Sequence, residues 1–229
     1  MLDLPAPATG LLDALGAVGL SYPDLVQRST ALVLFGSRAA GCAREGSDWD
    51  LLAIGEGPCP VARHLDLVWI HPRDLDSGTF LATELAGHVA RYGRWLHGPF
   101  DWRSAVACGP AAAERKARRL ASRLCALERA WPLLTPGLRC EERTLFRRDL
   151  QRFDLLARSE AVPPSRMLDE AWETLPDPQD DLLRMANAAG LSAGLLTRVL
   201  IPPQEAEAPV DQAEFSGLSS TPRREVRWG

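Results

Sequence analysis

At 229 residues, the chain is long enough to bury a sizeable core in one large domain or two small ones. The hydrophobic share of 46% and the charged share of 24% are ordinary for a globular protein, and the net charge of −4 argues against a general polycation made for nucleic acid. The five cysteines are odd in number and include no C-x-x-C pair, so they indicate neither a disulfide framework nor a zinc site and favour a reduced, cytoplasmic setting.

The chain begins with MLDLPAPATG, which has neither the basic nor the apolar segment of a signal peptide, and no later run approaches the roughly 18 apolar residues of a membrane span. We therefore expect no membrane association. Thr9 is expected to cap a short helix with Leu11, Leu15 and Val18 on its apolar face. A helix is also expected over residues 79–92. Between these helices lie three strand-like runs: ALVLF (31–35), DLLAI (50–54) and LDLVWI (65–70).

From about residue 110 the strand patterns stop and helical periodicity takes over. Pro110 stands where a first helical residue is expected, and that helix is expected to end at Trp131-Pro132. Thr135-Pro136 opens a second helix, and further helices are expected over 165–175 and 180–200. The apolar faces of the first two helices consist of Ala117, Leu120, Leu124, Leu127 and Trp131, and of Phe146, Leu150, Phe153 and Ala157.

The two halves differ in charge as well as in pattern. Residues 1–102 hold 7 Arg against 12 Asp and Glu, a net of −5, whereas residues 111–158 hold 12 Lys and Arg against 6 acids, a net of +6. We interpret the basic segment as the solvated outer face of a helical bundle, with a surface that meets a nucleotide or another anion as the alternative. We expect one domain at 1–105, a helical domain at 110–203 and, because periodicity then ends, a polar tail at 204–229.

Asp48 and Asp50 flank Trp49 at the start of the second strand-like run. Side chains alternate along a strand, so the two carboxylates are expected on one side, about 6.6 Å apart, with Trp49 pointing toward the core. Two carboxylates this close repel each other, and the pair is unfavourable unless a cation lies between them. Mg²⁺ is the natural guest, because it takes oxygen ligands and shares them with substrate phosphates.

Gly36-Ser37 and Asp66 complete the candidate site. A glycine after a strand lets backbone N–H groups approach an oxyanion closely, and the serine hydroxyl adds a donor, so this pair is a candidate holder of phosphates. Asp66 stands inside an otherwise apolar strand, where an isolated carboxylate is unfavourable. We interpret Asp66 as a third metal ligand, and an edge-strand residue that faces water is the alternative. Two ions about 3.5–4 Å apart and bridged by carboxylates are the arrangement that suits phosphoryl transfer.

The order of these residues, Gly-Ser, ten residues, Asp-x-Asp and then a lone Asp in a third strand, resembles the nucleotidyltransferase superfamily of DNA polymerase β over roughly residues 25–100. The segment GSRAAGCAREGSDWDLL is particularly similar to minimal nucleotidyltransferases and to aminoglycoside nucleotidyltransferases. The resemblance implies an α/β (α+β) nucleotidyltransferase domain with a small mixed sheet, followed in this chain by an α-helical bundle domain. HVARYGRWLHG, residues 88–98, resembles the stretch that closes the catalytic domain in these proteins.

The resemblance also assigns expected roles to the site residues. It implies that Gly36 and Ser37 bind the triphosphate, and that the aspartates at 48, 50 and 66 ligate two Mg²⁺ ions. It further implies that Asp66 helps to deprotonate the acceptor hydroxyl. Arg38 matches the pattern as well, either as a phosphate contact or as a surface residue.

The expected reaction is therefore transfer of NMP, with ATP favoured over other NTPs, to an acceptor hydroxyl with release of pyrophosphate. We expect a small polyhydroxylated or amino-bearing acceptor, because a helical C-terminal domain completes the acceptor cleft in aminoglycoside nucleotidyltransferases. Modification of a protein or a tRNA, as in minimal nucleotidyltransferases that act as antitoxins or toxins, is the second alternative. A catalytically silent binding module is the third, and the presence of all three aspartates argues against it.

Overall fold

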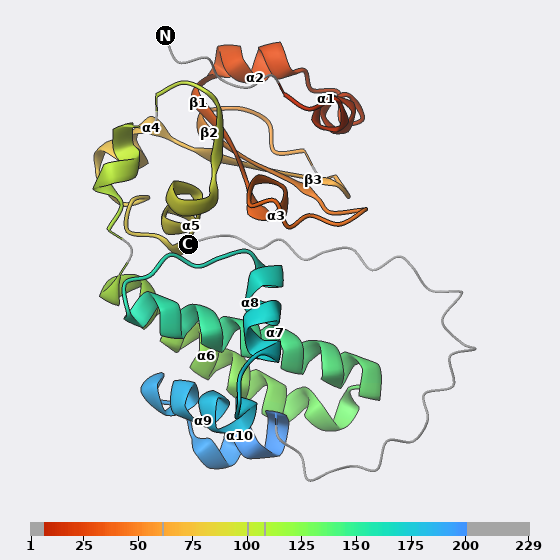
Figure 1. Ribbon diagram of the computed structural model, residues 1–229, viewed down its shortest axis with the longest axis vertical. Helices are drawn as coiled ribbons and strands as arrows, with labels where there is room; N and C mark the ends of the chain where they lie inside the picture. Colours follow the sequence, from red (N-terminus) through yellow and green to blue (C-terminus); the bar gives the residue numbers. More distant parts are fainter. Residues whose placement is uncertain (1–6, 61, 100, 108, 201–229) are drawn as a thin grey trace, which may run out of the picture.

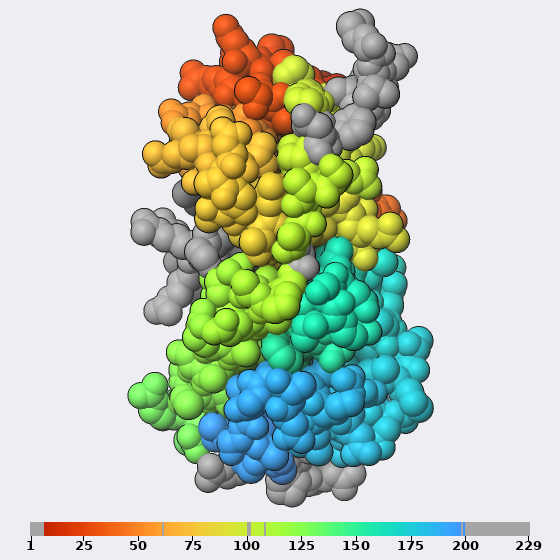
Figure 2. All heavy atoms as spheres, turned by 90° about the vertical axis from the view of Figure 1, so that its left-hand side faces the viewer, coloured from red at the N-terminus to blue at the C-terminus, as the bar shows by residue number. Residues whose placement is uncertain are grey.

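The computed structural model describes residues 7–60, 62–99, 101–107 and 109–200. Within these ranges a four-stranded sheet with flanking helices is followed by a region of helices, and Figures 1 and 2 show the two parts stacked along the long axis of the molecule. This arrangement confirms the small mixed sheet followed by helices that the sequence predicts. The expected tail at 204–229 lies outside the described residues. Among the helices of the described ranges, none combines the length and the apolar character that a bilayer crossing requires.

The sheet has the strand order β3-β2-β1-β4. β1 runs antiparallel to both β2 and β4, whereas β2 and β3 are parallel, so the sheet is mixed and β3 lies at one edge. The strands are β1 (Ser29–Phe35), β2 (Trp49–Gly55), β3 (Leu65–Ile70) and β4 (Arg94–His97). The three predicted strands are confirmed, whereas the four residues of β4 are too few for their pattern to indicate a strand.

Alternating side chains of the strands fill a core on each face of the sheet, as the period of two requires. On one face, Leu32 and Leu34 of β1 pack in a cluster with residues of α1 (Thr9–Gly16) and α2 (Tyr22–Arg28). On the opposite face, Val33 and Phe35 pack with residues of α5 (Glu84–Tyr92). Because helices cover both faces, β1 is almost continuously apolar instead of alternating with polar residues.

The helical region is built on two long helices, α6 (Pro110–Ala130) and α7 (Pro136–Ala157), which pack against each other. Their buried residues form one core with α9 (Pro178–Ala188) and α10 (Ala193–Leu200), while α8 (Ser165–Glu173) packs against α7. As predicted, Pro110 is the first residue of α6, and Thr135 caps α7, its side chain accepting a hydrogen bond from the N–H of Leu138. This core shares no residue with the two clusters of the sheet.

Two expected helix starts are wrong. Thr9 is the first residue of α1 and not its cap; Ala8 occupies the capping position and makes no side-chain bond there. The helix expected from residue 79 begins only at Glu84, because the hydroxyl of Thr83 accepts from the N–H of Ala86 and so fixes the start of α5. At α5 the local cap, and not the apolar pattern, therefore decides where the helix begins, whereas no side-chain cap marks the start of α1. Val18, expected on the apolar face of the first helix, lies beyond its last residue, Gly16.

Three expectations for the later helices are also wrong. The single helix expected over 180–200 is divided into α9 and α10, because Gly190 adopts a φ of +70°, a conformation that ends a helix. On α7 the last buried position belongs to Leu156, whereas Ala157 is exposed. The helix expected over 165–175 ends two residues earlier, at Glu173.

A cluster of buried charges joins α5 to the helical region. Lys116 of α6, the only lysine in the chain, is 8% exposed, and its Nζ atom lies 2.9 Å from the carboxylate of Glu84 and 3.4 Å from that of Asp149 in α7. Arg152 pairs with the same Asp149 at 3.1 Å. Burial alone raises the pKa of the Asp149 carboxyl, but the charges of Lys116, Arg152 and Arg123 outweigh it and hold that pKa below its ordinary value. The interface between the two regions is therefore polar and closely paired.

Candidate active site

The parallel pairing of β2 and β3 places Asp50 and Asp66 side by side. Their Cα atoms are partners in the ladder, so the two side chains stand on the same face of the sheet. That face is the one covered by α5, since Leu52 and Val68, two residues further along each strand, pack in the α5 cluster. Asp66 is exposed on the edge strand, as expected for an edge-strand residue that faces water. It also lies beside Asp50, as expected for a third metal ligand.

Gly36 forms a sharp turn directly against Asp50. It follows β1 and opens the short helix α3 (Gly36–Ala39) with a φ of +70°, which strongly favours glycine. A Cβ atom at this position would lie 2.8 Å from Cγ of Asp50 and closer still to its Oδ2 atom. The backbone of the turn therefore approaches the carboxylate as closely as a residue without a side chain allows. Ser37, the next residue in α3, is carried by the same turn.

Arg38 binds the loop that carries Asp48. Its Nη2 and Nε atoms donate to the carbonyl of Ser47 at 2.6 and 3.0 Å, and Nε also lies 3.2 Å from the carbonyl of Asp48. The guanidinium stacks over the ring of Trp49, 4.1 Å from the ring centre. Trp49 itself is half-buried against the cluster of the α1 face, in agreement with the expected inward orientation. Arg38 thus fixes the backbone just before β2.

Asp48 lies one residue before the first residue of β2, close to a histidine. Its Oδ1 atom lies 3.8 Å from Nδ1 of His64, the residue before β3. The side chains are 25% exposed for Asp48 and 57% exposed for His64, so solvent reaches both. The sequence reasoning did not select His64, although its place beside a strand that carries Asp66 is a usable signal.

Carboxylate oxygens are the ligands that Mg²⁺ prefers, and the pair Asp50 and Asp66 offers them on adjacent strands. Within the described ranges, no group of three or more His, Cys, Asp or Glu side chains is gathered closely enough to hold a metal ion. The fold therefore brings Asp50, Asp66 and Gly36 together, whereas the expected convergence of all three aspartates is not seen in this conformation. The donor set is suited to Mg²⁺ in its chemistry and in its strand placement.

His88 of α5 contacts the Gly36 turn and is a second residue that the sequence reasoning missed. Its Nε2 atom accepts a hydrogen bond from the N–H of Gly36 at 3.2 Å, and its Nδ1 atom lies 2.7 Å from the carbonyl oxygen of Val162. Burial lowers the pKa of His88 and is the largest influence; the hydrogen bond to Val162 raises the pKa in part, the charge of Arg152 lowers it, and the charge of Glu84 has a smaller raising effect. No pattern around His88 in the sequence indicates this role.

The helical region approaches the same loop from the other side. Nη1 of Arg166 in α8 donates to the carbonyl of Cys42 at 3.0 Å, and Cys42 lies between Ser37 and Asp48 in the chain. Nη2 of Arg115 in α6 donates to the carbonyl of Ala82 at 2.8 Å, just before α5. Both contacts join side chains of the helical region to backbone atoms near the candidate site.

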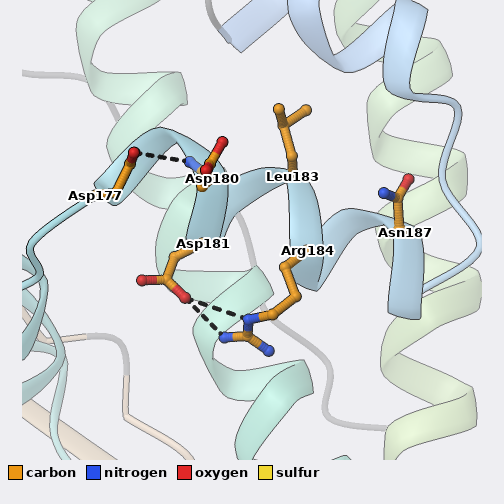
Figure 3. A pocket seen from close by; sticks show the side chains of 6 residues that line it. All are labelled: Asp177, Asp180, Asp181, Leu183, Arg184 and Asn187. Carbon is orange, nitrogen blue, oxygen red and sulfur yellow. Dashed lines mark hydrogen bonds and ion pairs between the residues drawn. The ribbon is translucent and has the colours of Figure 1, made fainter.

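A surface hollow on α9, drawn in Figure 3, is not part of this site. Three of its polar side chains have structural partners: Asp181 pairs with Arg184 at 3.1 Å, and Asp177 accepts from the backbone N–H of Asp180 as the helix cap. All of its lining residues come from α9 or its cap, and Figure 1 shows α9 at the end of the molecule away from the sheet. We assign it no function.

Comparison with known proteins identifies the sheet region. Residues 23–80 match the family model described as nucleotidyltransferase domain, a segment that contains β1, α3, β2 and β3 and all six predicted site residues. No curated protein matches the chain. The match confirms the domain that the Gly-Ser and Asp-x-Asp spacing predicts, and with it the expected reaction class, the enzymatic transfer of a nucleotidyl group.

Proposed function

We propose that this chain, which carries a nucleotidyltransferase domain at residues 23–80, transfers NMP from ATP or another NTP to a hydroxyl group of a small polyhydroxylated or amino-bearing molecule. The observation that carries the proposal is the contact between the Gly36 turn and Asp50, which pairs in register with Asp66. The acceptor oxygen attacks the α-phosphorus, and the bond from that phosphorus to the oxygen that bridges to the β-phosphate breaks. Pyrophosphate leaves, and the acceptor proton passes to a base, for which Asp66 is our candidate.

Asp48, Asp50 and Asp66 would hold Mg²⁺ in this proposal, because Asp50 and Asp66 offer carboxylate oxygens from adjacent strands on the α5 face and Asp48 lies just before the first of these strands. When bound, the metal neutralises phosphate charge and supports both the attacking and the leaving oxygen. The carboxylates have to converge for this purpose. Asp50 is confined by the Gly36 turn, whereas Asp48 is partly exposed beside His64, so the Asp48 side chain is the one with room to move.

Gly36 and Ser37 would bind the β- and γ-phosphates through the backbone of the turn and the serine hydroxyl. Arg38 has a different role in our proposal. Its guanidinium is already engaged by the carbonyls of Ser47 and Asp48 and by the ring of Trp49, so it holds the aspartate loop instead of contacting a phosphate.

The charge pairing of the helical region favours a small acceptor over RNA. Two of its arginines, Arg147 and Arg148, share the carboxylate of Asp169, and Arg123 pairs with Glu142 and Asp149. Because these cations are neutralised within the fold, they do not form an open basic surface for phosphates. Modification of a protein remains the second candidate, as the sequence resemblance suggests. We also propose that residues 1–105 and 110–203 are separate domains, in line with their separate cores.

The test incubates the full chain with NTPs labelled in the α-phosphate, with Mg²⁺ or with EDTA, first alone and then with cell lysate. Label that appears on small molecules only in the presence of Mg²⁺ is the expected result. Label on a protein band or on RNA would refute the small acceptor and support the second candidate. The Asp50→Asn variant is the control, and label transfer by this variant at the wild-type rate would refute the assigned site.

A further inference from the structure

The side chain of His88 bridges the Gly36 turn and the core of the helical region. We propose that His88 is a positioning residue, through which the helical region holds the Gly36 turn in its nucleotide-binding conformation. The inference rests on the proposed function, because it presumes that the Gly36 turn binds the nucleotide. It is carried by the two hydrogen bonds of one imidazole, to the N–H of Gly36 and to the carbonyl of Val162.

The two partners define the protonation of the ring. The Gly36 N–H is a donor, so Nε2 must present its lone pair. The Val162 oxygen is an acceptor, so Nδ1 must carry the hydrogen. His88 is therefore the neutral Nδ1–H tautomer, and a proton on Nε2 would abolish the bond to Gly36.

The surroundings of the ring hold it in place and keep it neutral. Phe35 at the end of β1 meets the imidazole edge to face, with ring centres 6.0 Å apart, and Tyr92 of α5 lies 5.5 Å away. The charged groups that act on the ring are Arg152 of α7 and Glu84 of α5. Arg152 in turn lies 3.7 Å from Glu84, within the paired charge cluster of the interface, so the positive charge of Arg152 disfavours a second proton on His88.

The other end of the bridge is anchored in the helical core. Val162 lies in the connection between α7 and α8, and its side chain is 3% exposed among the core residues of the helical region. The position of its carbonyl therefore follows the packing of that region. The Gly36 end is equally constrained, since any shift of the turn displaces Asp50. A displacement of the α7–α8 connection is thus transmitted to the turn and to the carboxylate through a single ring.

The test compares His88→Asn with His88→Gln, because the two amides imitate different halves of the imidazole. The Asn amide ends near the place of Nδ1, so it can still donate to Val162 but cannot reach Gly36. The Gln side chain is one carbon longer, so its amide oxygen lies near the place of Nε2, where it can accept a hydrogen bond from the N–H of Gly36. His71→Asn, at the start of α4 (Pro72–Asp76), is the control for loss of an imidazole elsewhere in the sheet region.

Two measurements are made on each full-length variant: hydrogen exchange of the Gly36 amide by NMR, and NTP affinity by calorimetry with Mg²⁺. His88→Asn should speed exchange and weaken NTP binding by about three- to tenfold each, the range of one net hydrogen bond. His88→Gln and His71→Asn should stay within about twofold of wild type on the same scale. Equal effects in the two His88 variants, or unchanged exchange in His88→Asn, would overturn the proposal.

A pH series on the wild-type chain decides the matter if His88→Asn does not fold. Below the ordinary histidine pKa of 6.5, protonation of Nε2 should weaken NTP binding by wild type more than by His88→Gln. Identical pH profiles would overturn the inference. A wild-type chain that binds no NTP at any pH would instead refute the proposed function, and the exchange rate of Gly36 would still test the role of His88.

Discussion

Replacing Gly36 by alanine should displace the carboxylate of Asp50. The new Cβ atom would lie 2.8 Å from Cγ of Asp50, whereas ordinary van der Waals contact begins at 3.4 Å, so Cγ has to retreat by about 0.6 Å and the closer Oδ2 atom by more. The obstructing atoms include Cβ of Asp50 at 3.3 Å, so rotation of the carboxylate alone does not relieve the contact fully. A misplacement of this order near a reacting centre lowers turnover by roughly 10- to 100-fold.

The same substitution also strains the backbone. A φ of +70° is unfavourable for alanine by about 1–2 kcal/mol, which should lower the melting temperature by a few degrees in a chain of this size. Gly41→Ala is the matched control, because Gly41 has a φ of +74° and a Cβ there would meet no atom within 4 Å. Both variants should lose similar stability, and only Gly36→Ala should lose transfer of α-labelled NMP. Equal activity in the two variants would refute the reasoning that Gly36 confines Asp50.

Four other substitutions and conditions test separate parts of the structure. Asp66→Asn should lower kcat severely, while NTP affinity should fall by tenfold or less, about 1.4 kcal/mol. Turnover assays measure the first effect and calorimetry the second, and a wild-type kcat would refute a catalytic role for Asp66. Arg38→Lys keeps the charge but loses the planar fork, so label transfer should fall by about tenfold with little change in melting temperature; a full rate would contradict its role in holding the loop. Lys116→Met removes the buried cation that Glu84 and Asp149 share and leaves these half-buried carboxylates with arginine partners only, so it should lower the free energy of unfolding by about 2 kcal/mol in urea titrations, whereas the exposed Arg118→Met should change it by less than about 0.5 kcal/mol. Because the folded state lowers the pKa of His88, the unfolded chain binds more protons below pH 6.5, so stability present above that pH should decline as the pH falls through 6 and 5. His88→Gln should lack this decline, and the contribution of Asp149, whose pKa is lowered from 3.8, enters only in more acidic solution.

The sequence predicted those parts of the site that depend on local pattern. Strand periodicity placed Asp50 at the start of β2, with Asp48 just before the strand, and an acid inside an apolar run selected Asp66, which the parallel register does bring beside Asp50. The Gly-Ser pair after β1 likewise marked the turn, since a positive φ at the end of a strand favours glycine. These features are properties of short segments, so they are visible without the fold.

The contacts missed by the sequence reasoning are those made across the chain to backbone atoms. The partners of His88 lie 52 and 74 residues away, and both bonds are to main-chain groups that every residue type carries. Arg38 could not be assigned for the same reason, because its partners are the carbonyls of Ser47 and Asp48. Side-chain patterns carry no information about such main-chain donors and acceptors, whose positions depend on the tertiary fold.

The burial of Lys116 gives this chain a single place at which a lysine-specific protease can cut. In the folded state that bond lies within α6, with the side chain enclosed at the joint between the sheet region and the helical region. Cleavage requires the joint to open, and it would divide the chain into pieces of 116 and 113 residues that a gel resolves from the intact protein. The fraction of the chain that is cleaved during a brief exposure to the protease therefore measures the fraction of molecules that are open at that moment. Any compound that binds the closed form lowers this cleaved fraction in proportion to its occupancy. Collections of candidate acceptors can therefore be screened by protection from proteolysis before any reaction product is known.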